Sequence, residues 1–465
     1  MTLTAPPSRR ARSTAPPERL EKLPASVSLM VFTFGTAVLY VAALVYTLGT
    51  ASPEVWGALL LLPVLVGITI PMCSAAGRAQ RDARLARLLT VALVLKMVGA
   101  CARYAVNLQV YNGEADSKAY DHAGRLIAAQ LRGGHLYFGN GPIKDTHFIE
   151  VVTGVVYTII GNTQLGGFFV FSWLGFLGLY MFYRAIALAV PHGDHRRYAL
   201  LLFFLPSMMF WSSSIGKEAW MTFTLGAVAY GAARAFERRP FGFVFLALGL
   251  WGTEVCRPHM ALLILGGLLP AYVLRRAPQF SKAKKRQSLK IVGVAALVFA
   301  IVFTIGGVEQ RFKVSSADSA SASKVLDTTQ QQTTQGGSSF TPTRVHNPIQ
   351  LPAAFVGVMF RPFPWEAHTS QGVVSAFEGV FLMLLCLRSL RRLRRIPSEM
   401  VSTPYVMFAL VYVLVFVFAF STIGNFGILV RQRVQVYPLF FVMLAIPATA
   451  RLRNRSRMSR PTPVR

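Results

Sequence analysis

Charged residues are scarce in this chain of 465 residues, and acidic residues are the scarcer kind. Charged side chains make up 14% of the sequence, against roughly 25% in soluble proteins. Hydrophobic residues make up 53%, and the chain has 19 acidic residues against 48 Lys and Arg residues. This composition excludes a disordered chain, disfavours a soluble enzyme and indicates a protein that folds in a membrane.

Cysteine pairs and the common motifs of soluble enzymes are also missing. No two of the four cysteines form a CxxC pair, which excludes a disulfide framework and a zinc site of that spacing. We expect them to pack as small apolar side chains. The sequence has no GxGxxG, Walker A, GxSxG or HExxH motif, which excludes the usual soluble nucleotide-binding and hydrolytic sites.

Long apolar runs are what the sequence does contain. A helix of about 20 apolar residues spans a bilayer core, so we predict an all-α, polytopic bundle of about 12 transmembrane helices, within a range of about 10 to 13. These spans form a membrane domain at 27–450, between a tail at 1–26 that we expect to be disordered and a basic tail at 451–465. The predicted spans are 27–50, 55–76, 88–110, 164–190, 197–213, 217–235, 241–256, 259–275, 290–308, 373–388, 403–421 and 433–450.

Basic residues are distributed unevenly among the predicted loops. With a cytoplasmic N-terminus, the inner loops and the two tails carry 32 of the 48 Lys and Arg residues but only six acids. Because cytoplasmic loops are enriched in Lys and Arg, we predict a multi-pass plasma-membrane protein with both termini in the cytoplasm. Membrane lipids are then expected partners and nucleic acid is not. Two long loops, 111–163 and 309–372, face outward, and we expect the Ser-, Thr- and Gln-rich segment 315–343 to be mobile.

The first outer loop is the most polar ordered stretch of the chain. From Ser117 to Leu131 it has the pattern of a helix on the membrane surface, which ends at two glycines. Residues 148–161 are expected to form a second interfacial or re-entrant helix. Asp116 precedes the first helix and is expected to cap it, to act as a catalytic carboxylate, or to do both.

Two further residues of this loop are candidates for the chemistry. Asp145 is interpreted as a second carboxylate or a metal ligand, and alternatively as a solvated acid beside Lys144. His147 is interpreted as a metal or substrate ligand, and alternatively as an ordinary loop histidine. The sequence therefore leaves a divalent cation open as a cofactor.

Ionisable residues also gather at the outward ends of the predicted spans. Charges at such depths are costly and so point to function, although snorkelling, helix-start pairs and structural loops are alternatives. Arginine binds phosphate oxygens in a bidentate way, so we predict that this set holds a lipid phosphate or pyrophosphate. The residues assigned to substrate binding are Lys217, Glu218, Arg257, His259, Arg361, Glu366, His368, Arg431 and Arg433.

The segment Glu114-Ala115-Asp116-Ser117-Lys118-Ala119-Tyr120 resembles the acidic motif in the first outer loop of GT-C type integral membrane glycosyltransferases. The resemblance implies that Asp116 is the general base or a metal ligand. In a transferase of this kind we expect Asp145 or His147 to assist it. Lys118 and Tyr120 are assigned to substrate binding with it. It also implies a sugar donor linked to polyprenyl phosphate and a glycan or lipid acceptor. Ser117 stands where a paired acid would be, which leaves a metal-free mechanism open.

Two other functions are compatible with the sequence. Wzy-like polysaccharide polymerases and O-antigen ligases also have about twelve helices and outward arginines, and such a protein would depend on the arginines and a histidine rather than on Asp116. A lipid or solute transporter is a further alternative, but the charges cluster at one face and no inverted repeat is visible. The predicted function is therefore transfer of a sugar or glycan from a polyprenyl-phosphate carrier to a cell-envelope acceptor.

Overall fold

The computed structural model describes residues 25–50, 52–80, 82–111, 115–274, 283–312, 338–345 and 347–448, and residues 327, 330, 331 and 333. Most of the two predicted tails and of the predicted mobile segment 315–343, and Glu114 of the acidic motif, lie outside these residues. Within them the chain is helical, without strands, and the one extended pairing is an isolated bridge between Ser339 and Asn425. The all-α prediction is confirmed for the described part.

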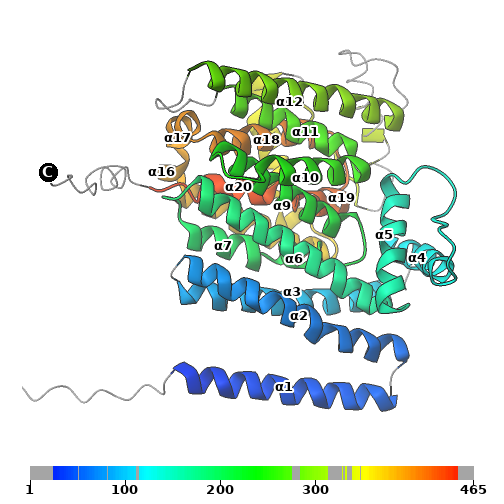
Figure 1. Ribbon diagram of the computed structural model, residues 1–465. Coiled ribbons are helices and arrows are strands. Elements are labelled where there is room, and N and C mark those ends of the chain that lie inside the picture. Colours follow the sequence, from blue (N-terminus) through cyan, green and yellow to red (C-terminus); the bar gives the residue numbers. More distant parts are fainter. Residues whose placement is uncertain are drawn as a thin grey trace, which may run out of the picture. The chain divides into compact units, whose positions relative to one another are not determined.

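The chain divides into two units, Met1–Trp56 and Gly57–Arg465. The first contains α1 (Ala25–Thr50) and the start of α2 (Pro53–Ala79). The second contains the rest of α2 and all later helices (Figure 1). Its first half consists of α3 (Ala83–Gln109), α4 (Asp116–Arg132), α5 (Asp145–Ile160), α6 (Gln164–Ala189), α7 (His195–Phe204), α8 (Pro206–Phe210), α9 (Lys217–Phe236), α10 (Gly242–Cys256) and α11 (Pro258–Val273). Its second half consists of α12 (Ala283–Phe312), η1 (Pro348–Gln350), α14 (Leu351–Phe360), η2 (Pro364–Glu366), α15 (Ser370–Arg388), α16 (Leu390–Leu393), α17 (Ile396–Ser402), α18 (Pro404–Phe420), α19 (Phe426–Arg433) and α20 (Tyr437–Leu444).

Helices that are long and apolar enough to cross a membrane are present in the described residues. Four meet both conditions: Glu54–Ala79, Ala83–Gln109, Gln164–Ala189 and Ser370–Arg388. Other apolar helices, such as α10, α11 and α18, have 10–17 residues. The chain is thus a helical membrane protein, and the count of about 12 spans stays a prediction.

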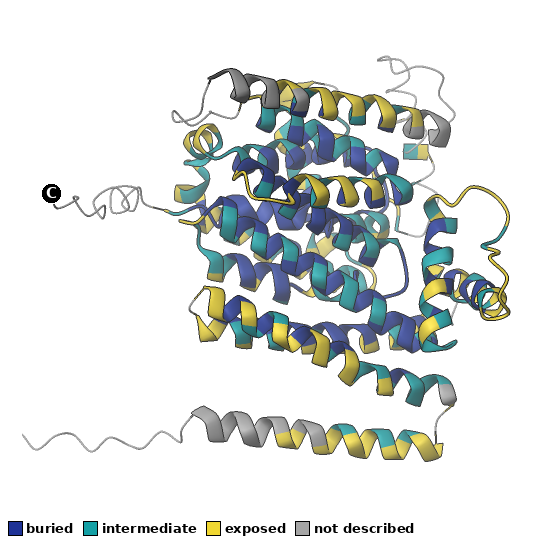
Figure 2. Cartoon of the chain, in the orientation of Figure 1, coloured by how far each residue is buried: buried dark blue, intermediate teal, exposed yellow. Residues whose placement is uncertain are grey.

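Several helices carry exposed residues along one face (Figure 2). Many of these residues are large and apolar. On α15, Phe377, Phe381 and Leu384 are exposed at helical spacing, and α2 exposes Leu60, Val64 and Ile68 in the same way. Extended apolar surface of this kind is rare on monomeric proteins in water. These faces therefore fit contact with lipid hydrocarbon.

The predicted span at 197–213 is not one continuous helix, because the segment is broken. α7 ends at Phe204, and α8 begins at Pro206 and has five residues. Leu205 between them has ψ 130, as expected for a residue that precedes proline. The short helix α8 ends at Phe210, and the loop Trp211–Gly216 leads from it to the start of α9.

Two other predicted boundaries are also wrong. The last span, 433–450, contains only the eight residues of α20, and the predicted outer turn 422–432 contains most of α19. Helix α19 begins before the predicted span, because the Asn425 side chain accepts the Ile428 N–H as an N-cap. The predicted outer loop 309–372 contains α14, an apolar helix with proline in its first turn.

Helices α6 and α9 approach each other closely through glycines. A Cβ added at Gly178 would lie 2.2 Å from Thr222 O, and one at Gly226 would lie 2.3 Å from Gly178 O. Small residues permit such close contact between membrane helices. The packing fixes α9, whose first turn carries Glu218.

The two ends of the bundle are built differently (Figure 1). The short helices α4 and α5 lie together at one end, and α16 and α17 lie at the other. We refer to these as the α4–α5 end and the α16–α17 end.

Gly178→Ala is expected to destabilise the protein, because the new methyl group meets backbone atoms of α9 rather than a movable side chain. Overpacking of this kind costs about 1–3 kcal/mol. The measurement is the midpoint of thermal unfolding of the detergent-purified protein. Gly266→Ala in α11 is the matched control, since a Cβ there has nothing within 4 Å, and it should leave the midpoint unchanged or raise it. Equal midpoints for the two variants would contradict the close packing of α6 on α9.

Candidate functional site

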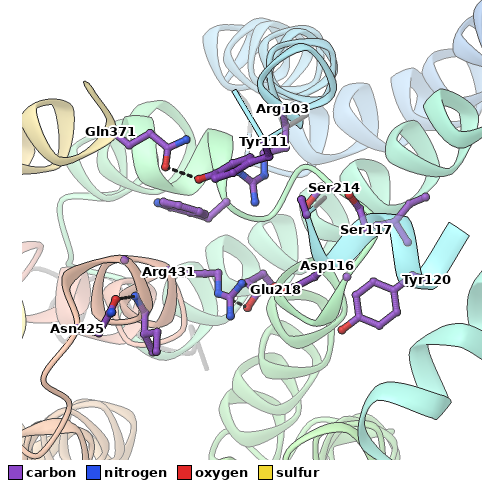
Figure 3. A pocket seen from close by; sticks show the side chains of 16 residues that line it. Arg103, Tyr111, Asp116, Ser117, Tyr120, Ser214, Glu218, Gln371, Asn425 and Arg431 are labelled. Carbon is purple, nitrogen blue, oxygen red and sulfur yellow. Dashed lines mark hydrogen bonds and ion pairs between the residues drawn. The ribbon is translucent and has the colours of Figure 1, made fainter. Parts of the chain in front are cut away.

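A polar cavity of about 350 Å³ opens at the α4–α5 end of the second unit (Figure 3). Its walls come from the end of α3, the start of α4, the loop before α9, the starts of α9 and α15, and α19. The polar and charged residues that line it are Arg103, Tyr111, Asp116, Ser117, Tyr120, Ser214, Glu218, Gln371, Asn425 and Arg431.

An ion network joins the charged groups of this cavity. Arg431 Nη1 lies 2.8 Å from Asp116 Oδ2, and Arg431 Nε lies 3.2 Å from Glu218 Oε1. The same Glu218 oxygen accepts a hydrogen bond of 2.9 Å from Arg257 Nη2. Arg257 donates in turn to Gln432 Oε1, at 2.7 Å. The network therefore connects α4, α9, α11 and α19.

The two carboxylates of the network differ in environment. The Glu218 side chain is buried, at 11% exposure, and lies between two guanidinium groups, whereas that of Asp116 is 68% exposed. The Glu218 carboxylate raises the pKa of Arg431 above its ordinary value despite burial, and Asp116 adds to the effect. Asp116 is thus the carboxylate that meets the open cavity, and Glu218 is the charge that holds the arginines in place.

Asp116 does not cap α4, contrary to one of its two predicted roles. Ala115 occupies the N-cap position without a side-chain cap, and Asp116 is the first helical residue. Its carboxylate contacts Arg431 instead. A helix in the predicted place is confirmed, since α4 ends before Gly133 and buries Tyr120 and Ile127.

The α4 helix is anchored by close packing on α5. A Cβ at Gly124 would lie 2.6 Å from Thr153, and one at Gly154 would lie 2.5 Å from Ile127. The α5 helix is the second short helix that the sequence predicts at 148–161. Burial raises the pKa of Tyr120 above its usual value, so its hydroxyl stays protonated beside the cavity.

Two buried side chains, Lys96 and Glu378, anchor α8 and the start of the loop Trp211–Gly216 that follows it. Lys96 Nζ donates to Met208 O at 2.7 Å and to Ser212 Oγ at 2.6 Å. Glu378 Oε2 accepts the Ser207 N–H at 2.8 Å. The loop ends at Gly216, whose φ of 154 favours glycine and lets α9 begin at the cavity wall.

Asp145 and His147 do not line the cavity. Asp145 Oδ1 lies 2.5 Å from Lys217 Nζ, and Lys217 also donates to Thr146 Oγ1 at 2.9 Å. His147 Nδ1 lies 3.0 Å from Glu150 Oε2. The predicted catalytic trio is therefore split, with Asp116 alone facing the cavity.

Arg361, Glu366 and Arg433 belong to a neighbouring set of contacts that supports α14 and α19. Arg361 Nε donates to both carboxylate oxygens of Glu366, at 3.0 and 3.1 Å, and its guanidinium lies over the Phe340 ring. Partial burial raises the pKa of Glu366, but hydrogen bonds from Arg361 and the Phe363 N–H outweigh burial and lower it. Arg433 is buried and donates to Met359 O at 2.8 Å.

The remaining predicted residues are peripheral. Lys118 and His368 are exposed and do not line the cavity, and His259 is half-buried in the first turn of α11 next to Arg257. Of the predicted substrate-binding residues, the structure thus places Tyr120, Glu218 and Arg431 at the cavity wall and Arg257 directly behind Glu218.

Sequence reasoning missed Arg103, Tyr111, Gln371 and Asn425. Arg103 lies in the last two turns of the predicted span 88–110, and Gln371 lies just before the predicted span 373–388. Arg257 was identified because it is a charged residue at the end of an apolar run. The same signal could have identified Arg103.

Metal ligands are not grouped in the part of the chain that the structure describes: no three His, Cys, Asp or Glu side chains are placed to share an ion. The two carboxylates of the cavity, Asp116 and Glu218, both contact Arg431.

Comparison with protein-family models, curated proteins and solved structures finds no match for this chain.

Glu218→Gln is expected to lower the free energy of unfolding by about 3 kcal/mol, because it leaves the buried guanidinium of Arg257 and the half-buried one of Arg431 without their shared carboxylate. Asp116→Asn is the matched comparison. It breaks an ion pair whose carboxylate is largely exposed, so its cost should be about 1 kcal/mol or less. Denaturant unfolding in detergent, followed by circular dichroism, measures both. Equal costs would contradict the different burial of the two carboxylates.

Proposed function

We propose that this protein is a membrane glycosyltransferase that moves a sugar or glycan from a polyprenyl-phosphate carrier to a cell-envelope acceptor at the extracytoplasmic face. The observation that carries the proposal is the Asp116–Arg431 pair at the cavity wall. Glycosyl transfer needs a base for the acceptor hydroxyl and a cation for the leaving phosphate, and this pair supplies one of each.

The chemical step follows from these two groups. Asp116 accepts the proton of the acceptor hydroxyl as that oxygen bonds to the anomeric carbon of the donor sugar. The bond from this carbon to the carrier phosphate oxygen breaks, and its electron pair leaves on the phosphate. Arg431, held by Glu218, stabilises the added negative charge. A phosphate bound to Arg431 also competes for the guanidinium that Asp116 contacts, which releases the carboxylate to act as base.

The distribution of charge supports an extracytoplasmic position of the cavity. The α16–α17 end carries Arg388, Arg391, Arg392, Arg394 and Arg395 within eight residues. Arg392 pairs with Asp194 at 3.0 Å, which ties the start of α7 to the same end. Because cytoplasmic ends are rich in arginine, the opposite α4–α5 end faces outward in this proposal.

A polysaccharide polymerase or ligase is the second candidate function. The observation in its favour is that Arg103, Arg257 and Arg431 gather at one site while Asp116 is engaged by Arg431. In such an enzyme the guanidinium groups would carry the catalysis and Asp116 would have no role as a base.

Deletion of the gene is expected to cause a lipid-linked sugar or glycan to accumulate, and the wild-type gene is expected to clear it. Asp116→Asn should clear it at least about 100-fold more slowly, since general base catalysis contributes about 10²–10⁴-fold. Mass spectrometry of lipid extracts measures the pool.

Glu399→Gln is the control variant, because it also removes a carboxylate paired with an arginine, but at the α16–α17 end. It should clear the pool at the wild-type rate. Full clearance by Asp116→Asn would exclude Asp116 as the base and favour the polymerase or ligase. An unchanged glycan pool after gene deletion would refute glycosyl transfer altogether.

A further inference from the structure

One cation at the cavity, Arg103, has no carboxylate within ion-pair distance in the described residues, although Glu218 attracts it from farther away. Arg103 makes no ion pair in the described residues, whereas Arg257 and Arg431 both contact Glu218. Its guanidinium carbon lies 4.9 Å from the ring centroids of Phe210 and of Trp211. Its Nη1 atom is buried and has no hydrogen-bond partner.

A second unsatisfied donor lies on the same side of the cavity. Tyr111 OH donates to Gln371 Oε1 at 2.8 Å, which fixes the amide, and Gln371 Nε2 is buried without a partner. Gln371 is the second residue of α15, so the positive end of a helix dipole adds to the field there. Figure 3 shows Gln371, Tyr111 and Arg103 on one side of the cavity and Arg431, Glu218 and Asp116 on the other.

Buried donors without partners cost free energy, so a site that retains two of them is built for a ligand that satisfies both. One of the two donors, Arg103, carries a full positive charge. A neutral hydroxyl or amide of a ligand would not compensate this charge. A phosphate ester supplies both the negative charge and several acceptor oxygens. The cavity volume of about 350 Å³ is at the small end of the range for ligand sites, about 300–1,000 Å³, and so fits a headgroup rather than a whole isoprenoid lipid.

We propose that Arg103 and Gln371, joined through Tyr111, form the subsite that binds the phosphate of an isoprenoid phosphate. This inference rests on the proposed function and adds Arg103 and Gln371 to Arg431 as groups that bind the carrier phosphate. With the phosphate between Arg103 and Arg431, the donor sugar lies in the space towards Asp116, and the acceptor hydroxyl approaches from the Asp116 side.

The test is calorimetric titration of farnesyl monophosphate into the full chain in phosphatidylcholine nanodiscs. Arg103→Met and Gln371→Leu should each raise the Kd at least about tenfold, because each removes a donor to a charged ligand. Arg184→Met is the matched control. Arg184 also lies over aromatic rings, those of Tyr180 and Tyr230, but it does not line the cavity. It should leave the Kd unchanged.

Three results would overturn the assignment. Wild-type Kd values for both Arg103→Met and Gln371→Leu would exclude the subsite. An equal loss in Arg184→Met would mean that the variants act through the fold. Equally tight binding of inorganic phosphate, or loss of farnesyl phosphate binding in phosphatidylglycerol nanodiscs, would mean that the site takes free phosphate or any anionic headgroup. If the binding results hold but gene deletion leaves every glycan pool unchanged, the proposed function fails and the subsite stands.

Discussion

The Glu218 carboxylate, buried between Arg257 and Arg431, is the interaction on which the rest of the site depends. Removal of a charge from water is costly, and the cost is recovered only with well-placed partners. Because Glu218 is on α9, Arg257 at the start of α11 and Arg431 on α19, satisfying this one carboxylate fixes three helices relative to each other. Asp116, the first residue of α4, then joins through Arg431.

This arrangement gives two carboxylates different tasks through their environments. Glu218 is enclosed by cations and stays ionised as a structural counter-charge. Asp116 is largely exposed to the cavity and shares Arg431 with Glu218, so a bound phosphate can take that arginine from it. The same cavity holds Arg103, which makes no ion pair with any residue that the structure describes. The charges of Glu218, Asp116 and Arg431 on one wall are therefore paired with each other, whereas that of Arg103 on the other wall is not. This is expected for a site that binds an anion.

The sequence predicts those features that depend on local pattern. Apolar runs identify the helical class, the amphipathic pattern identifies α4, and charges at the ends of runs identify Glu218, Arg257 and Arg431. It does not predict which charges meet, because Asp116 and Arg431 are 315 residues apart. It also misses the break at Pro206 and the helix α14, since hydropathy reports a run of apolar residues but not where backbone geometry interrupts it or starts a helix within a loop. The number of spans stays open for the same reason.

The most direct test of the central claim is a double-mutant cycle on Asp116 and Arg431, measured as the turnover of the accumulated lipid-linked sugar by purified protein in vesicles. Residues that act as one catalytic unit show strongly non-additive losses. The account predicts that Asp116→Asn combined with Arg431→Met turns over the carrier no more slowly than the worse single variant. Losses that multiply in the double variant would contradict it, because the two side chains would then act independently.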